Sequence, residues 1–235
     1  DTMTRNDTPM ASDVHPKRNR RAPLLARFDD TSDAHEIGVD EVGRGPMFGR
    51  VYCAAVVVPT NSCSFKYDLM KDSKRFTSER LIREAADHVI ANSVSWSVCW
   101  EDEATIDRVN IRQATLQCMH RAINEVRSAL PAQEEVLIVV DGSDFKPITE
   151  YNDTSRSIVQ IPHQTVVGGD DRYVAIAAAS IIAKVARDDY IRELCRTYPA
   201  LDERYGLLGN KGYGSKRHID GIKQYGITDW HRQTY

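Results

Sequence analysis

Four acidic residues occupy positions where their side chains could bind metal ions. Asp40 and Glu41 directly follow one apolar segment, and Asp141 directly follows another. Asp188 lies in a later Ala- and Ile-rich segment, on the same helical face as Lys184, which precedes it by four residues. Carboxylates at the ends of buried strands converge at one edge of an open α/β sheet, where such sheets bind ligands. The spacing therefore predicts a cluster of four carboxylates.

Gathering carboxylates costs free energy because like charges repel one another and lose hydration. Divalent cations offset that cost, and oxygen-only ligands favour Mg²⁺ or Mn²⁺ over Zn²⁺. Two such ions about 4 Å apart activate a water molecule and stabilise the leaving oxygen in phosphodiester hydrolysis. The cluster therefore predicts a site for two Mg²⁺ or Mn²⁺ ions that acts on a phosphodiester.

Composition alone leaves this chemistry open. Adjacent strand residues point to opposite faces, so Asp40 and Glu41 share one site only if the strand bends. We expect Asp40 to bridge both ions, and Glu41 to reach one of them through a bend, a water molecule or its backbone carbonyl. Acids that cap helices or occupy turns explain the same positions equally well. Asp170 and Asp171 are interpreted in that way, as N-cap residues rather than metal ligands.

The apolar patterns predict the elements that would hold these acids. Strands are indicated by continuous apolar runs or by alternation of apolar and polar residues, and helices by a period near 3.6. Strands are expected at residues 36–41, 51–58, 94–100, 136–140 and 157–161. Helices are expected at residues 79–91, 103–129 and 171–196. This order predicts an α/β fold in which helices flank both faces of a mixed sheet.

The length suits one domain with short extensions. The 235 residues are 41% hydrophobic, which is enough for a core of this size. We expect a flexible N-terminal tail at residues 1–34, a catalytic domain at residues 35–197 and a small C-terminal helical lobe at residues 198–235. A basic cluster at residues 17–21 is consistent with a solvated tail, a nucleic-acid tether or a localisation signal.

Charge and cysteine content narrow the class of protein. The net charge is −3, so any nucleic-acid binding must come from a local basic patch. The five cysteines form no C-x-x-C pair and are odd in number, which argues against a zinc site and against a disulfide framework. The sequence has no apolar run long enough to span a bilayer and no secretory signal. We therefore expect a cytosolic or nuclear protein without membrane association, with a cytoplasmic location as the simplest case. At this length, a monomer is the simpler expectation.

Seven segments match, in order, the motifs of one known enzyme family. They are Gly38-Val39-Asp40-Glu41-Val42-Gly43-Arg44-Gly45-Pro46, Asp72-Ser73-Lys74-Arg75, Ile106-Asp107 with Asn110-Ile111, Val140-Asp141-Gly142, Gly169-Asp170 with residues 177–188, Lys211-Gly212-Tyr213-Gly214, and His231-Arg232. Together they resemble ribonuclease HII, the type 2 ribonucleases H, over about residues 36–235. One Asp-Glu pair would mean little, whereas seven ordered segments are highly specific.

The resemblance implies roles for individual residues. The catalytic and metal-binding residues would be Asp40, Glu41, Asp141 and Asp188. Gly43, Arg44 and Gly45 would form the loop that contacts the ribose 2′-OH, since glycine lets a backbone approach a sugar closely. Tyr213 would pack at the RNA–DNA junction, where an aromatic face suits a sugar without a 2′-OH. Phosphate contacts would come from Ser73, Lys74, Lys184 and Lys211.

The resemblance also implies a fold and a reaction. The expected fold is the ribonuclease H-like mixed sheet with helices and a C-terminal helical lobe. The expected reaction is hydrolysis of the phosphodiester 5′ to a ribonucleotide, which leaves 3′-OH and 5′-phosphate ends. The expected substrates are RNA/DNA hybrids and single ribonucleotides embedded in duplex DNA. The chain departs from the family pattern at Arg50, where proline is common, at Arg75, where lysine is usual, and after Arg232.

Two other interpretations share part of this pattern. A catalytically silent relative would bind RNA/DNA hybrids without cutting, yet a pure binder gains nothing from a costly negative cluster beside a phosphate backbone. The second is another metal-dependent enzyme of the same fold, such as a 3′-exonuclease or an integrase-like transferase. The loop formed by Gly43, Arg44 and Gly45, together with Tyr213, favours the type 2 ribonuclease.

Overall fold

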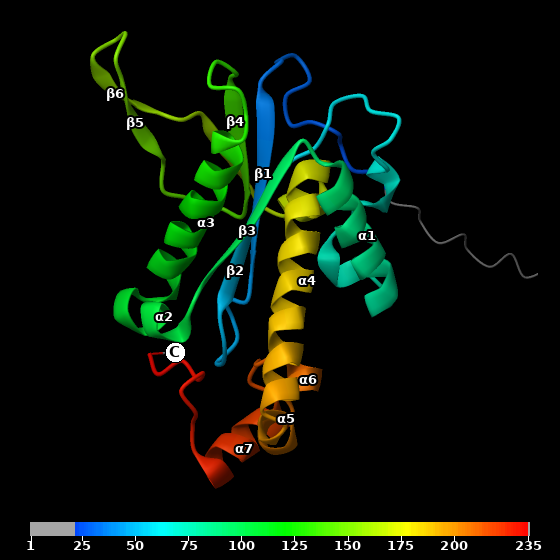
Figure 1. The fold of residues 1–235 in the computed structure, drawn as a ribbon, viewed down its shortest axis with the longest axis vertical. Helices are drawn as coiled ribbons and strands as arrows, with labels where there is room; N and C mark the ends of the chain where they lie inside the picture. Colours follow the sequence, from blue (N-terminus) through cyan, green and yellow to red (C-terminus); the bar gives the residue numbers. More distant parts are fainter. Residues whose placement is uncertain (1–21, 235) are drawn as a thin grey trace, which may run out of the picture.

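A five-stranded mixed sheet forms the centre of the molecule in the computed structural model, which describes residues 22–234 (Figure 1). Its strands are β1 (His35–Val42), β2 (Val51–Val57), β3 (Ser95–Glu101), β4 (Val136–Asp141) and β7 (His163–Val166), in the order β3-β2-β1-β4-β7. Strand β1 pairs antiparallel with β2 and parallel with β4, and β7 pairs parallel with β4. The mixed sheet predicted from the sequence is confirmed.

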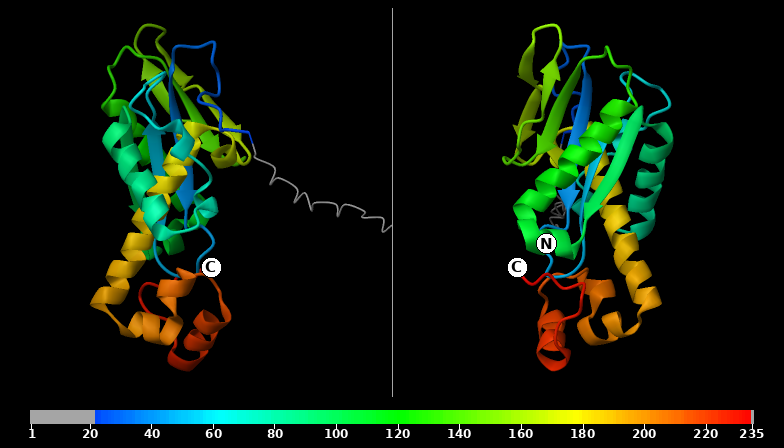
Figure 2. Two further views of the ribbon diagram at one scale, coloured as in Figure 1. Left: turned by 90° about the vertical axis from the view of Figure 1, so that its right-hand side faces the viewer. Right: turned by 60° about the vertical axis from the view of Figure 1, so that its left-hand side comes forward.

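Helices cover both faces of this sheet, as predicted (Figure 2). Helix α3 (Ile111–Ser128) packs against β2 and β3 on one face. Helix α4 (Val174–Thr197) packs against β1 and β2 on the other face, with α1 (Glu79–Asn92) beside it. Three short 3-10 helices are η1 (Tyr67–Leu69), η2 (Ser73–Arg75) and η3 (Gly169–Asp171). The central strands β1, β2 and β4 are therefore buried on both sides, which explains their apolar sequences.

Helix α4 approaches β1 closely because residue 38 is a glycine. A Cβ atom added at Gly38 would lie 2.2 Å from the backbone carbonyl carbon of Ala175, far inside van der Waals contact. The neighbouring residue Val39 faces the opposite side and belongs to the core beneath α3. Because side chains alternate along a strand, Asp40 faces α4. Because Gly38 lets α4 approach β1 closely, Asp40 lies directly beneath this helix.

The single helix expected at residues 103–129 is in fact two helices. Helix α2 (Glu103–Val109) ends at Asn110, and α3 begins with the next residue. Asn110 has a φ of 71°, in the left-handed region, which interrupts the helix. Its side chain accepts a hydrogen bond of 3.0 Å from the backbone N–H of Gln113 and so caps α3. The apolar periodicity continues through this break, so periodicity alone did not reveal it.

A small hairpin stands outside the main sheet. Strands β5 (Thr149–Asn152) and β6 (Ser157–Gln160) pair only with each other in an antiparallel ribbon, which projects at the upper left of Figure 1. The strand expected at residues 157–161 therefore exists, but it does not belong to the main sheet. The edge position next to β4 is taken by β7, which was not predicted.

Residues 22–34, which the sequence assigns to an N-terminal tail, contact the domain in the structure. The backbone N–H of Leu25 donates to the carbonyl oxygen of Arg172 at 2.8 Å, and the N–H of Val174 donates to the carbonyl of Leu25 at 3.0 Å. These two bonds join the segment to the start of α4. Residues 1–21, including the basic cluster at residues 17–21, lie outside the described residues.

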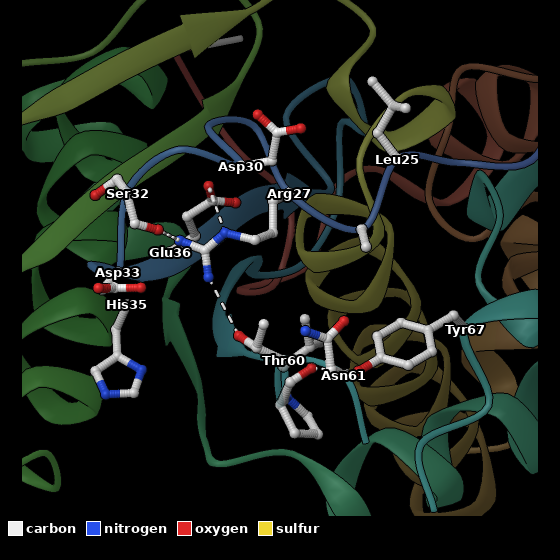
Figure 3. A pocket seen from close by; sticks show the side chains of 13 residues that line it. Leu25, Arg27, Asp30, Ser32, Asp33, His35, Glu36, Thr60, Asn61 and Tyr67 are labelled. Atoms are coloured by element: carbon white, nitrogen blue, oxygen red, sulfur yellow. Dashed lines mark hydrogen bonds and ion pairs between the residues drawn. The ribbon is translucent and has the colours of Figure 1, made fainter. Parts of the chain in front are cut away.

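Arg27 and Glu36 hold the same segment at the start of β1 (Figure 3). Arg27 donates to the carbonyl of Ser32 at 2.7 Å and to the hydroxyl of Thr60 at 3.2 Å. The carboxylate of Glu36 accepts a hydrogen bond of 2.8 Å from the backbone N–H of Phe28. The contacts with Ser32 and Glu36 are local, whereas the contact between Arg27 and Thr60 joins residues 33 positions apart, which local polarity could not predict.

Three short helices form a C-terminal lobe at the lower end of Figure 1. They are α5 (Ala200–Tyr205), α6 (Leu207–Asn210) and α7 (Lys216–Tyr225). The chain then returns to the main body, where His231 forms a β-bridge with Phe48 in the loop between β1 and β2. Within residues 22–234, no helix has the length and apolar character needed to cross a membrane.

Candidate active site

A cavity of about 490 Å³ lies where the carboxyl ends of β1 and β4 meet the C-terminal lobe. All of the residues predicted from the sequence as site residues line it. They are Asp40, Glu41, Gly43, Arg44, Gly45, Ser73, Lys74, Asp141, Lys184, Asp188, Lys211 and Tyr213. Asp170, Ser180 and Arg187 line it as well. The fold thus brings together residues that are up to 173 positions apart in the sequence, from Asp40 to Tyr213.

Asp40 and Asp141 lie level with each other at the ends of neighbouring strands. Strands β1 and β4 are parallel, and their register pairs Val39 with Val140, so the next step along both strands brings the two aspartates side by side. Glu41 follows on the opposite face of β1, as strand alternation requires. It still lines the cavity, and Arg44 forms an ion pair of 3.4 Å with its carboxylate.

Asp40 is buried, with only 4% of its surface exposed. It accepts a hydrogen bond of 2.7 Å from the backbone N–H of Glu41. Ser180, which also lines the cavity, shares a hydrogen bond of 3.0 Å with the hydroxyl of Ser73. Burial, followed by the charges of Glu41 and Asp141, raises the pKa of Asp40 well above its usual value. An ionised Asp40 is therefore costly unless a cation stands beside it.

Asp170 is a site residue that the sequence patterns did not identify. It lies in η3, and the backbone N–H of its neighbour Gly169 donates to Asp141 Oδ1 at 2.6 Å. Burial, followed by the charges of Asp141 and Asp72, raises the pKa of Asp170 to about 6. The charge of Asp170 in turn contributes to the raised pKa of Asp40. Asp170 therefore belongs to the same group of interacting carboxylates.

The expectation that Asp170 and Asp171 cap the following helix is wrong. Tyr173 occupies the N-cap position of α4, without a capping hydrogen bond from its side chain, and Asp171 forms an ion pair of 2.5 Å with Arg75. The signal that identifies Asp170 is its position just after a strand parallel to β4. That strand, β7, escaped prediction because only its last residue, Val166, is buried.

Asp188 lines the same cavity, but its charge is already paired. Lys184, one turn earlier in α4, forms an ion pair with Asp188 Oδ2. The other oxygen, Oδ1, is buried and has no hydrogen-bond partner in the described part of the chain. The largest charge effects on the pKa of Asp40 come from Glu41, Asp141 and Asp170. Asp170 and Asp188 therefore both line the cavity that holds Asp40 and Asp141, and the assignment of Asp188 as the fourth carboxylate stays a prediction from the sequence.

The donor set of the cavity fits hard divalent cations. Its ligating side chains are carboxylates, and none of the described lining residues is a histidine or cysteine. Among residues 22–234, no three Asp, Glu, His or Cys side chains are placed to hold one ion by themselves. Mg²⁺ is usually held by one or two carboxylates together with waters and substrate phosphates. The raised pKa values of Asp40 and Asp170, and the unpartnered oxygen of Asp188, are consistent with such an ion.

The loop after β1 forms one wall of the cavity. Gly43 has a φ of 93°, which favours glycine, and a Cβ atom there would lie 2.3 Å from Arg187 Nε. A Cβ atom on Gly45 would lie 3.1 Å from the ring of Tyr213. The Tyr213 side chain is 49% exposed, so its ring remains accessible to a ligand. The loop and Tyr213 thus form one continuous surface.

The raised pKa of Asp170 predicts a pH dependence of stability in the metal-free protein. Between its usual pKa near 3.8 and its folded value of about 6, the folded protein holds a proton that the unfolded chain has released. The free energy of unfolding should therefore fall as pH rises from about 4 to 7, by on the order of 1 kcal/mol from this group, because solvent screens a carboxyl that is only partly buried. Urea unfolding in EDTA, followed by circular dichroism, measures this change.

The Asp170→Asn variant isolates this effect from those of other titrating groups. Asn does not ionise, so the variant lacks the loss of stability that the unmodified protein undergoes. The unfolding free energy of the variant minus that of the unmodified protein should therefore increase as pH rises from 4 to 7. A difference that stays constant over this range would show that Asp170 titrates normally in the folded state.

Comparison with known proteins agrees with this geometry. The family model described as Ribonuclease HII matches residues 37–235. Ribonuclease HII of Parabacteroides distasonis is 40% identical over 200 residues, which cover 85% of this chain and 89% of that protein. Ribonuclease HII of Phocaeicola vulgatus is 38% identical over 205 residues, which cover 86% and 90%. The solved structure of ribonuclease H2 from Pyrococcus horikoshii matches with a TM-score of 0.62 and 26% identity, over 85% of this chain and 93% of that one.

The mixed sheet, its flanking helices and the acidic cavity at the strand ends define a ribonuclease H-like nuclease. Both the family model and the relatives extend over most of the chain. The chain belongs to the ribonuclease HII family, the metal-dependent endoribonucleases that act on RNA/DNA hybrids. The resemblance inferred from the seven motifs is thereby confirmed.

Proposed function

We propose that this protein cuts the RNA strand of RNA/DNA hybrids, and also cuts 5′ of single ribonucleotides in duplex DNA, by a mechanism with two divalent cations. The products would carry 3′-OH and 5′-phosphate ends. The observation that supports this most is the adjacency of Asp40, Asp141 and Asp170 in a cavity shared with the glycine loop and Tyr213. The cytoplasmic location and the monomeric state stay predictions from the sequence.

The carboxylates would hold the cations. Asp40 lies level with Asp141 and next to Glu41 in the chain, so these three residues would hold the ions together, and Asp170 would complete the set. Asp188, predicted from the sequence as a ligand, would instead contribute through its unpartnered oxygen, with Lys184 holding the other. When bound, Mg²⁺ or Mn²⁺ would supply an activated water and stabilise the leaving oxygen.

The remaining residues of the cavity would position the substrate. The backbone of Gly43, Arg44 and Gly45 would contact the ribose 2′-OH, which is the group that separates RNA from DNA. Tyr213, in contact range of Gly45, would stack on the adjoining deoxyribose. Phosphate contacts would come from Ser73, Lys74, Lys184 and Lys211. These contacts orient the duplex without reading its sequence.

The test of this function is a cleavage assay on duplex DNA that contains one ribonucleotide, with Mg²⁺ or Mn²⁺. The expected result is a single cut on the 5′ side of the ribonucleotide, with a 5′-phosphate on the downstream product. A cut on the 3′ side, or a 2′,3′-cyclic phosphate product, would contradict the mechanism. Tight binding of the duplex without any cut would favour the alternative, a catalytically silent hybrid binder.

Replacement of Tyr213 by alanine should impair junction substrates selectively. Loss of one stacking contact of ~1–3 kcal/mol should lower kcat/KM about tenfold or more on a single embedded ribonucleotide. The loss on an all-RNA/DNA hybrid should be smaller, because every sugar of the RNA strand carries a 2′-OH. Steady-state kinetics on the two substrates measure this difference.

Tyr225 offers a matched control for this variant. It lies in the same lobe and has nearly the same exposure, 48% against 49% for Tyr213, but it does not line the cavity. Tyr225→Ala should leave both substrates unaffected. Equal losses on the two substrates for Tyr213→Ala would reject a role at the junction.

A further inference from the structure

The end of the chain runs along the loop of residues 43–49, which forms a wall of the cavity. The backbone N–H of Gly49 donates to the carbonyl of Trp230 at 2.8 Å. The N–H of Arg232 donates to the carbonyl of Met47 at 2.9 Å, on either side of the β-bridge between Phe48 and His231. The loop that faces the substrate is therefore paired with the last residues of the protein.

The side chain of Arg232 binds this loop from within. It is buried, with 5% of its surface exposed, and its guanidinium donates to four backbone carbonyls. They belong to Gly43 (2.6 Å), Arg44 (3.1 Å), Pro46 (2.7 Å) and Gly49 (2.8 Å). A guanidinium presents its donors in a rigid planar fork, so four simultaneous acceptors fix the path of the loop more strictly than a flexible side chain would.

This arrangement determines where the loop's own N–H groups point. In a trans peptide, the N–H of each residue points away from the preceding carbonyl oxygen. The carbonyls of Gly43 and Arg44 point at the buried guanidinium, so the N–H groups of Arg44 and Gly45 point away from it. Both residues line the cavity. Arg232 thus orients the donors that would meet a sugar hydroxyl.

A second buried arginine, Arg187, does not bind the carbonyls that Arg232 binds. Arg187 of α4 donates to the carbonyls of Arg50, Lys211 and Phe48, at 3.0, 2.9 and 3.0 Å. It therefore fixes the far end of the loop and ties it to the C-terminal lobe. The carbonyls of Gly43, Arg44 and Pro46 are bound by Arg232.

The position of Arg232 is itself set from outside the loop. Asp107 of α2 accepts hydrogen bonds from the backbone N–H groups of Gln233, at 2.9 Å, and Thr234, at 3.1 Å. Before Arg232, the ring of His231 lies edge-on to Phe48 and accepts a hydrogen bond of 2.9 Å from the N–H of Thr228. The segment is thus anchored on both sides of the arginine.

We propose that Arg232 is a positioning residue for ribose recognition, which presents the N–H groups of Arg44 and Gly45 to the 2′-OH. The inference rests on the proposed function of this loop. Its prediction is specific: loss of the fork should weaken the preference for a ribonucleotide over a deoxyribonucleotide, rather than duplex binding in general. A purely structural arginine would weaken both in proportion.

The test compares Arg232→Lys with the unmodified protein in EDTA, so that no strand is cut. Fluorescence anisotropy gives Kd for a DNA duplex with one ribonucleotide and for the same duplex with deoxyribose throughout. Lysine keeps the charge but cannot reach four carbonyls. We expect the Kd for the ribonucleotide duplex to rise while the Kd for the all-DNA duplex stays unchanged. The ratio of the all-DNA Kd to the ribonucleotide Kd should therefore fall about fivefold or more, as for loss of one or two hydrogen bonds. The exposed Arg204, changed to lysine, is the control and should keep the ratio.

The Kd values separate ribose recognition by the loop from the positioning role of Arg232. An unmodified protein that binds both duplexes equally would overturn ribose recognition by the loop, and the inference with it. If the unmodified protein binds the ribonucleotide duplex more tightly and Arg232→Lys keeps the same ratio of Kd values, the positioning role of Arg232 is wrong. Ribose recognition by the loop would still stand. Equal weakening of both Kd values in the variant would also contradict the positioning role.

A second variant keeps the test decisive if Arg232→Lys does not fold. Asp107→Ala removes the anchor of Gln233 and Thr234 from a partly exposed helix position, where alanine favours the helix. It should lower the same ratio of Kd values in the same direction, by a smaller factor. An unchanged ratio in folded Asp107→Ala would count against the positioning role.

Discussion

The Asp40→Asn variant should lose kcat on an RNA/DNA hybrid by about 10³-fold or more, because cations at such sites contribute several kcal/mol of transition-state stabilisation. Asp40 is buried between Glu41 and Asp141, and the amide has the same shape without the charge. Substrate binding should persist or become tighter, since one negative charge facing the phosphates is gone. Single-turnover kinetics and a Kd measured in EDTA separate the two effects.

Asp144 provides the matched control. It follows Asp141 by three residues, but its carboxylate is held by Arg112 through two hydrogen bonds of 2.8 and 2.7 Å and does not line the cavity. Asp144→Asn should therefore keep full activity. Retention of activity in Asp40→Asn, with Asp144→Asn equally active, would remove the basis for a carboxylate mechanism at this cavity.

The second large effect concerns the fourth carboxylate. Asp170→Asn should lower kcat about 10²-fold or more and raise the Mn²⁺ concentration needed for half-maximal rate, as expected for a lost ligand. Asp188→Asn should have a smaller effect, about tenfold, because its amide oxygen can still accept a hydrogen bond from Lys184. Rates measured over a series of Mn²⁺ concentrations compare the two variants directly.

The opposite order would reverse the assignment. If Asp188→Asn lost more activity and more metal affinity than Asp170→Asn, the ligand would be the residue predicted from the helical face. The raised pKa of Asp170 would then reflect only burial and the neighbouring Asp141.

Of the five carboxylates among residues 22–234 that line the cavity, all but Asp170 are predicted by the sequence, and three of them lie at the ends of strands. Asp40, Glu41 and Asp141 end strands whose apolar patterns are strong, because these strands are buried on both faces. Parallel pairing of the two strands then brings the acids to one edge. Asp170 follows a strand with little apolar pattern, so its position depended on tertiary pairing that no local signal reveals.

The least predictable features are the contacts made by buried arginines. Composition places charged residues at the surface, yet Arg187 and Arg232 are 1% and 5% exposed. Both guanidinium groups donate to backbone carbonyls in the loop between β1 and β2, more than 130 residues earlier in the chain. Arg27 also donates to the hydroxyl of Thr60, 33 residues later in the chain, and so joins the segment of residues 22–34 to the main domain. Such contacts join distant residues and leave no periodic trace in the sequence.

Anomalous diffraction from crystals of the protein with Mn²⁺ and a ribonucleotide-containing duplex would show directly whether these carboxylates bind metal. We expect two manganese peaks about 4 Å apart, bound by oxygens of Asp40, Glu41, Asp141 and Asp170, on either side of the phosphate 5′ to the ribonucleotide. Manganese away from Asp40, or a duplex seated outside the cavity, would contradict this expectation.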